Sequence, residues 1–212
     1  MIRIVCIAVS LALAAPVIAA EPAEPVTNPT MLIDSVTAEG VAEIVREIGG
    51  QNVQIAQVDK SNVVTFSDAG IPYNLGIVQC DVRPGKCVGL IMVVVMEGGQ
   101  ISLETINTRN KSDVFLSVAK FDDTKTGIGR ALLVDSGVTK KNIAMNISAF
   151  AGAVQLAIKT LNQQVVASTG QQQYLRAASA APFRPALLPP HEAARIIAAF
   201  DKPYATRLLG RR

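Results

Sequence analysis

The sequence predicts an α+β fold, in which an antiparallel β-sheet packs with helices, followed by a mostly irregular C-terminal tail. Two segments, residues 37–50 and 139–165, repeat apolar residues at the spacing of an amphipathic helix. Between them, short segments rich in β-branched residues alternate with turns of hairpin length. Because these strands are grouped between helices rather than interleaved with them, an antiparallel sheet with helices on it is the expected arrangement.

Local patterns define the individual elements. Thr37 is a suitable N-cap for the first helix, and Gly49 and Gly50 end it. We expect strands at residues 53–58, 63–66, 73–80, 88–96, 114–121 and 128–134, a short helix at 101–110 and a long helix from residue 139.

The segment 88–96 differs from the other predicted strands because it is apolar on both faces. Such a strand is typically central and covered on both sides. We expect the cover to come at least in part from another chain or from the tail. The candidate interface residues are Val88, Leu90, Met92, Val94 and Met96.

The distribution of proline marks the ends of the folded domain. The chain has 11 prolines, of which only Pro72 and Pro84 lie between residues 31 and 167. We therefore expect a signal peptide at 1–20, a linker at 21–30, the α+β domain at 31–167 and a basic tail rich in proline, alanine and glutamine at 168–212.

The first twenty residues have the organisation of a secretory signal peptide. Arg3 supplies the positive start, residues 4–14 form an apolar run, and Ala19 and Ala20 are small residues suited to cleavage. The run is shorter than the roughly 20 residues that span a bilayer. The alternative is an uncleaved N-terminal anchor. We expect export, with the periplasm as the destination.

Cys80 and Cys87 flank a Pro-Gly turn between two predicted strands. If residues 82–85 form the loop, the two cysteines lie opposite each other, which suits a disulfide. Cys6 would leave with the signal peptide, and an even number of cysteines in an exported chain indicates a disulfide. A redox-active or metal-binding pair is the alternative, although the spacing is not C-x-x-C and no histidine lies nearby.

Three short motifs resemble the YbjN family. They are Ile-Asn-x-x-Asn at residues 106–110, an Asp-Asp pair in a strand-joining loop at 122–123, and Ser-Gly-Val-Thr at 136–139 before the long helix. The resemblance extends over residues 31–161 and includes the order of elements and the paired cysteines.

The chain also departs from the family pattern. An aromatic residue is usual where Thr108 and Arg109 stand, and a second glycine where Ser136 stands. The resemblance implies a fold like the type III secretion chaperones, which act by binding other proteins. It also implies a role as a sensory transduction regulator and no catalytic residue.

Asn107, Asn110 and Asp122 are the candidate polar site residues. The two asparagines share a helix face, where amides commonly satisfy the backbone of an adjacent strand or loop; ligand binding is the alternative. Asp122 suits a solvated turn, since a calcium loop of the EF-hand type needs more oxygen ligands. We expect no metal and no cofactor.

Charge separates the domain from the tail. The domain has twelve basic and thirteen acidic residues, which gives no electrostatic footprint for nucleic acid, whereas the tail has a net charge of +5. Residues 191–200 suit a short helix with Ile196, Ile197 and Phe200 on one side and Arg195 near its edge. The tail is either a disordered extension or a segment that docks on a partner or a membrane surface.

Three functions are consistent with these observations. The first is a non-enzymatic exported protein-binding module of the bacterial cell envelope, chaperone-like or regulatory, whose partner is another protein or a second copy. The second is a peripheral envelope protein held on anionic membrane by its basic tail. The third, an enzyme, would depend on Asn107, Asn110 and Asp122 alone.

Overall fold

The computed structural model describes residues 26–58, 61–80, 86–98, 101–172 and 184–209. Side chains are described up to residue 162 in the long helix and up to residue 200 in the last helix. The predicted signal peptide and residues 21–25 of the linker lie outside the described residues, as do residues 173–183 of the tail.

The described residues form four helices and nine strands. The helices are α1 (Ala38–Glu47), α2 (Leu103–Ser112), α3 (Lys140–Gln172) and α4 (Pro190–Leu209). The strands are β1 (Leu32–Ile33), β2 (Gln51–Val58), β3 (Ser61–Asp68), β4 (Ile71–Val78), β5 (Gly89–Glu97), β6 (Ser117–Lys120), β7 (Lys125–Leu133), β8 (Val138–Thr139) and β9 (Arg184–Pro185).

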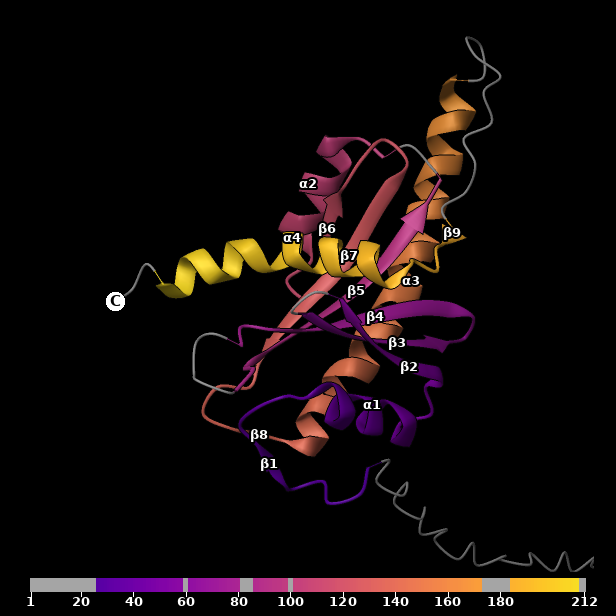
Figure 1. Cartoon of the computed structure of the whole chain (residues 1–212). Helices are drawn as coiled ribbons and strands as arrows, with labels where there is room; N and C mark the ends of the chain where they lie inside the picture. The colour runs from indigo at the N-terminus through magenta and orange to yellow at the C-terminus, as the bar shows by residue number, and fades with distance from the viewer. Residues whose placement is uncertain (1–25, 59–60, 81–85, 99–100, 173–183, 210–212) are drawn as a thin grey trace, which may run out of the picture.

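One antiparallel sheet organises the molecule. Its strands follow the order β2-β3-β4-β5-β7-β6, β9 pairs with the end of β5, and β1 and β8 form a separate pair. The long helix α3 runs behind the sheet and α4 crosses in front of it (Figure 1). The predicted α+β fold with an antiparallel sheet is therefore confirmed.

The main core lies between the sheet and the helices α1 and α3. Both helices contribute fully buried side chains to it, namely Ala42, Val45, Ile143, Ile147, Phe150 and Val154. By length and composition, α3 could also cross a membrane over Lys140–Asn162, with 39% of that window buried inside the fold. In this structure its apolar side is the centre of the core.

Capping residues set where the first two helices begin. Thr37 accepts a hydrogen bond from the Gly40 amide at 3.1 Å, as predicted, and Ser102 accepts one from the Thr105 amide at 3.1 Å. The strand predicted at 114–121 is shorter in the structure. Asp113 ends α2 and accepts hydrogen bonds from the amides of Phe115 and Leu116, so the chain turns before β6 begins.

The central strand β5 is covered on both faces, as its sequence predicts. However, the five candidate interface residues Val88, Leu90, Met92, Val94 and Met96 are at most 2% exposed and belong to the main core. Their assignment to an interface is therefore corrected, because α1 and α3 of the same chain cover this side of the sheet. The side chains of β5 that point to the other side of the sheet, Ile91, Val93 and Val95, belong to a second apolar cluster with its own cover.

That second cover comes from the predicted tail, which is more regular than expected. Residues 168–172 continue α3, and residues 184–209 contain β9 and the 20-residue helix α4. The reason is that α4 has an apolar sheet face on which to bury one side, and tertiary packing of this kind stabilises helices that sequence alone leaves marginal.

Cys80 and Cys87 form a disulfide, as predicted. The bond joins the end of β4 to the start of β5, where the Val88 amide donates a hydrogen bond to the Gln79 carbonyl. Both cysteines pack against the main core. A bonded pair is compatible with an oxidising compartment.

Candidate helix-binding face of the sheet

A second apolar cluster lies on the sheet face opposite the main core. Its buried members are Val63, Ile91, Val93 and Val95 from the strands and Leu188, Ala193, Ile196 and Ile197 from α4 and the segment before it. The strand residues reach this face because successive side chains point to opposite sides of a strand. We call this surface the α4 face.

Three glycines hollow the α4 face. Gly76 of β4 pairs with Ile91, and Gly129 and Gly127 of β7 pair with Val93 and Val95. A Cβ atom at Gly76 would lie 2.8 Å from Ile197 Cδ1, and one at Gly129 would lie 2.8 Å from Phe200 Cε1. Because glycine has no side chain, these positions leave a recess in the sheet surface, and two apolar side chains of α4 fill it.

Aromatic packing closes the recess at β7. Phe200 of α4 meets Phe121 edge to face, with ring centroids 5.7 Å apart. A Cβ atom at Gly127 would lie 2.9 Å from Phe121 Cζ, so that position also excludes a side chain. Its apolar anchors are thus Ile196, Ile197 and Phe200, the three residues that the sequence places on one side of a short helix.

Polar contacts fix the start of α4. Ala186 donates a backbone hydrogen bond of 2.8 Å to the Val95 carbonyl, continuing the pairing of β9 with β5. Lys125 of β7 forms ion pairs with Glu192 in the first turn of α4 and with Glu97 at 3.8 Å. The hydrogen bond to Glu192 raises the pKa of Lys125 above its ordinary value. Arg195 is exposed on the outer side of the helix.

One polar group on the α4 face is left unsatisfied. Asn74 of β4 pairs with Val93, which places its side chain on this face, and the residue is 2% exposed. Its Nδ2 donor has no hydrogen-bond partner among the described residues. An unpaired buried donor costs about 1–3 kcal/mol. The resident helix therefore fits the apolar recess better than it fits this amide.

The candidate polar residues do not form one site. Asn110 binds the backbone of β6 twice: its Nδ2 donates to the Val118 carbonyl at 2.8 Å, and its Oδ1 accepts from the Val118 amide at 2.7 Å. Asn107 is exposed. Asp122 accepts hydrogen bonds from Thr124 and from the Lys125 amide in the β6–β7 turn. The Thr124 amide is the main cause of its lowered pKa.

These contacts give Asn110 and Asp122 structural roles, as the sequence analysis expects for a helix amide and a turn acid. Asp123 pairs with Lys120 at 3.0 Å. Among the described residues, no group of three or more His, Cys, Asp or Glu side chains could hold a metal ion.

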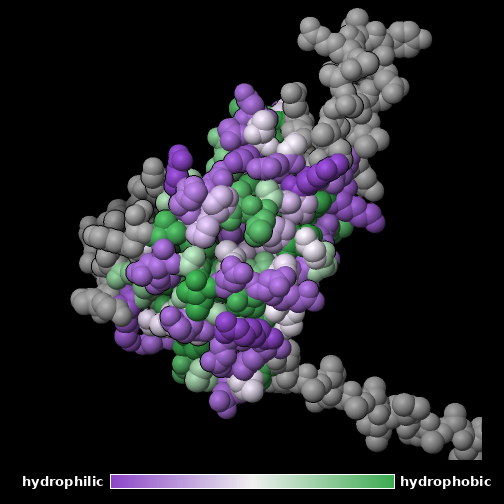
Figure 2. Space-filling model, turned by 45° about the vertical axis from the view of Figure 1, so that its right-hand side comes forward, coloured by the Kyte–Doolittle hydropathy of each residue, from purple (hydrophilic) through white to green (hydrophobic). Residues whose placement is uncertain are grey.

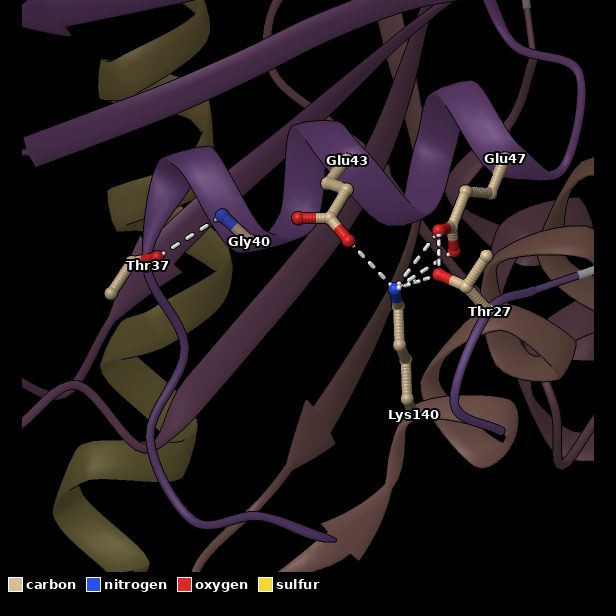
Figure 3. Close-up of polar contacts among 6 residues, drawn as sticks. All are labelled: Thr27, Thr37, Gly40, Glu43, Glu47 and Lys140. Atoms are coloured by element: carbon tan, nitrogen blue, oxygen red, sulfur yellow. Dashed lines mark hydrogen bonds and ion pairs between the residues drawn. The ribbon is translucent and has the colours of Figure 1, made fainter. Parts of the chain in front are cut away.

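A charged cluster around the buried Lys140, between α1 and the start of α3, was missed by sequence reasoning. Lys140, 3% exposed at the start of α3, lies 2.8 Å from Glu43 and 2.9 Å from Glu47 of α1 and 3.2 Å from the Thr27 hydroxyl. Figure 3 shows its ammonium group between these three oxygen-bearing side chains. The only local signal was the four-residue spacing of the two glutamates, which puts them on one helix face.

The charges of this cluster compensate one another. Burial alone lowers the pKa of Lys140, but the hydrogen bonds to Glu43 and Glu47 raise it above its ordinary value. Glu47 also accepts a hydrogen bond from Thr27, which is the main cause of its lowered pKa, followed by the bond from Lys140. The cluster joins α1, α3 and the segment before β1, and we assign it a structural role.

Comparison with models of known families, with curated proteins and with solved structures finds no match to this chain. The fold and the α4 face define its class: an α+β domain with a helix seated on one face of its sheet.

Proposed function

We propose that this protein is a non-enzymatic, exported protein-binding module of the bacterial cell envelope, chaperone-like or regulatory, and that the α4 face is its binding site for an amphipathic helix. The observation that supports this proposal is the glycine recess filled by Ile197 and Phe200. Proteins that bind helices in grooves recognise apolar anchors at such helical spacings. In this chain α4 supplies the anchors itself, as an internal ligand.

The fit of α4 supports exchange with another helix. Its anchors end at Phe200, and the part of the helix that follows runs beyond the sheet (Figure 1). It also leaves the Nδ2 donor of Asn74 without an acceptor in the part of the chain that the structure describes. A partner helix with the same anchors and a hydrogen-bond acceptor over Asn74 would therefore bind this face more favourably.

Export is supported by the residues rather than by the fold. The pattern of residues 1–20 is that of a signal peptide, and the Cys80–Cys87 bond needs an oxidising compartment to persist. The motif resemblance to the YbjN family agrees with a binding role, because the chaperones whose fold it implies act by binding proteins.

A labelled peptide of residues 186–204 tests the proposal. The mature protein with Ile197→Ala and Phe200→Ala has weakened internal anchors, so it should bind the peptide at least tenfold more tightly than the unsubstituted protein does. Adding Gly129→Ala to that protein should remove binding by narrowing the recess. A peptide with Asp at both anchor positions is the matched control.

Absence of peptide binding to the anchor variant, with its circular dichroism unchanged, would overturn the proposal. So would equal binding by the peptide and its Asp control.

Membrane attachment through the tail is the alternative function, and it would use the same helix. Arg195 is exposed, but Ile196 and Ile197 are at most 7% exposed against the sheet. Insertion of that side into a bilayer would therefore require α4 to leave the sheet. Flotation with anionic vesicles, comparing the mature protein with an Arg195→Glu and Lys202→Glu variant, distinguishes the two functions.

A further inference from the structure

The two edges of the sheet differ in how well they are protected. The β6 edge is four residues long and ends in Lys120. Beside it, the Asn110 amide binds both the N–H and the C=O of Val118, so the side chain takes the place of a neighbouring strand. Natural sheets protect their edges with short strands, charges and covering segments of this kind.

The β2 edge lacks most of these protections. Its eight residues, Gln51–Val58, contain no charge and no proline. Among the described strands, β3 is its only partner, so every second backbone N–H and C=O of β2 points away from the sheet. A bulge between Gln51 and Gln54, where Asn52 has a φ of 54°, disrupts only the start of the strand.

The regular part of β2 has apolar surface that the fold leaves open. It runs from Gln54 to Val58, and each of its residues pairs with β3 without interruption. Ile55 is 42% exposed and belongs to neither apolar cluster. The view of Figure 2 shows a surface on which hydrophobic and hydrophilic residues are mixed.

We infer that two copies of this chain pair through their β2 edges, as antiparallel strands related by a two-fold axis. A neutral strand accepts an identical neighbour without placing like charges opposite each other, whereas a charged partner segment would find no countercharge on β2. The occupant that this edge fits is therefore a second copy. The two sheets would then form one continuous sheet.

The regular segment specifies the register. Pairing centred on Ala56 places Ala56 opposite its own copy, Ile55 opposite Gln57, and Gln54 opposite Val58. Every pair lies on one side of the joined sheet, as strand alternation requires, and all five regular residues are used. The exposed Ile55 side chain gains a neighbour in the partner. Although α4 also contacts β2, the pairing uses the outward backbone groups of β2 and not the glycine recess, so the inference does not depend on the proposed function.

Charge substitution tests this pairing in the mature, disulfide-bonded protein. Ile55→Lys with Gln57→Lys places lysine opposite lysine at two positions across the axis. We expect the dimer dissociation constant, measured by sedimentation velocity, to rise at least tenfold. Ile55→Glu with Gln57→Glu should also be monomeric, and an equimolar mixture of the two variants should restore the dimer. Asn107→Lys with Thr108→Lys adds the same charge on exposed positions of α2 and should leave the dimer unchanged.

A second measurement examines the register without changing the charge. Ala56→Cys should form an intermolecular disulfide on mild oxidation, and Thr108→Cys should not. The inference is overturned if the unsubstituted protein is monomeric at every concentration in a 100-fold dilution series that starts at its highest soluble concentration. It is also overturned if the oppositely charged variants do not associate when mixed. It is also overturned if the two cysteine variants cross-link equally.

Discussion

Gly76 lies directly beneath Ile197, so close that no side chain fits between the strand and α4. The two residues are far apart in the chain, and their contact joins the predicted tail to the predicted domain. The sheet face and the helix that covers it are therefore one folding unit in this structure. Because the contact requires a residue without a side chain at position 76, even a substitution that adds one methyl group is a sensitive test of it.

Gly76→Ala should destabilise the protein by about 1–3 kcal/mol, the usual effect of adding a methyl group to a filled core. The Ile197 side chain or the whole helix must move to admit it. Urea unfolding followed by circular dichroism measures the change. Gly152→Ala is the matched control, because a Cβ atom there meets nothing within 4 Å and α3 gains helix propensity. Equal effects at the two glycines would contradict the tight fit.

Part of this arrangement could be predicted from the sequence. The apolar run of β5 predicted cover on both sides, and the spacing of Ile196, Ile197 and Phe200 suited a short helix with one apolar side, with disorder of the tail as the alternative to docking. The pattern could not tell which side of β5 faces which cover, because both sides are equally apolar. That is why Met92 and Val94 were assigned to an interface although α1 and α3 bury them.

Local sequence patterns could not predict contacts between residues that are far apart in the chain. Lys140 and Glu47 are 93 residues apart, and nothing near either residue specifies the other. The register that brings Gly76, Gly127 and Gly129 onto one face likewise depends on the pairing of three strands. By contrast, the Thr37 cap and the Cys80–Cys87 disulfide depend on residues close in the chain, and both were predicted; the predicted loop at 82–85 lies outside the described residues.

Lys140→Met should destabilise the fold by about 2 kcal/mol. Removing one partner of a buried ion pair usually costs roughly 3–5 kcal/mol, but Glu43 is 62% exposed and water can replace part of its interaction. Glu47, 18% exposed, would lose its counterion. Urea unfolding at pH 7 measures the loss. Lys159→Met, at an exposed position of the same helix, is the control, and a similar loss there would show that the cluster is not specifically stabilising.

Acid should weaken the protein through Glu47. The Thr27 and Lys140 hydrogen bonds hold the pKa of Glu47 below its ordinary value of 4.5, so its contribution is complete above pH 4.5 and disappears as the pH falls through the lower folded-state value. Glu47→Gln should make the unfolding free energy less dependent on pH below pH 4.5. An unchanged pH dependence would exclude this role. Comparison with the unsubstituted protein separates Glu47 from other acids such as Asp122.

Asn110→Ala should destabilise the protein by about 1–2 kcal/mol, because it leaves the Val118 N–H and C=O without their side-chain partner. Hydrogen exchange of the Val118 amide should become faster. Asn107→Ala, on the same helix but without the hydrogen bonds to Val118 that Asn110 makes, should change stability by less than about 0.5 kcal/mol. A larger effect at Asn107 than at Asn110 would reverse the assignment and favour a binding role for the motif.

Mass spectrometry of native protein tests export and the disulfide together. A chain translocated by its first twenty residues should begin after Ala19 or Ala20, and alkylation without reductant should modify neither Cys80 nor Cys87. Reduction should then lower stability by less than roughly 3 kcal/mol, because the closed loop is short. The Cys80→Ser and Cys87→Ser double variant controls for alkylation elsewhere. An intact Met1 together with alkylation of both Cys80 and Cys87 would place the protein in a reducing compartment and remove the envelope from its proposed function.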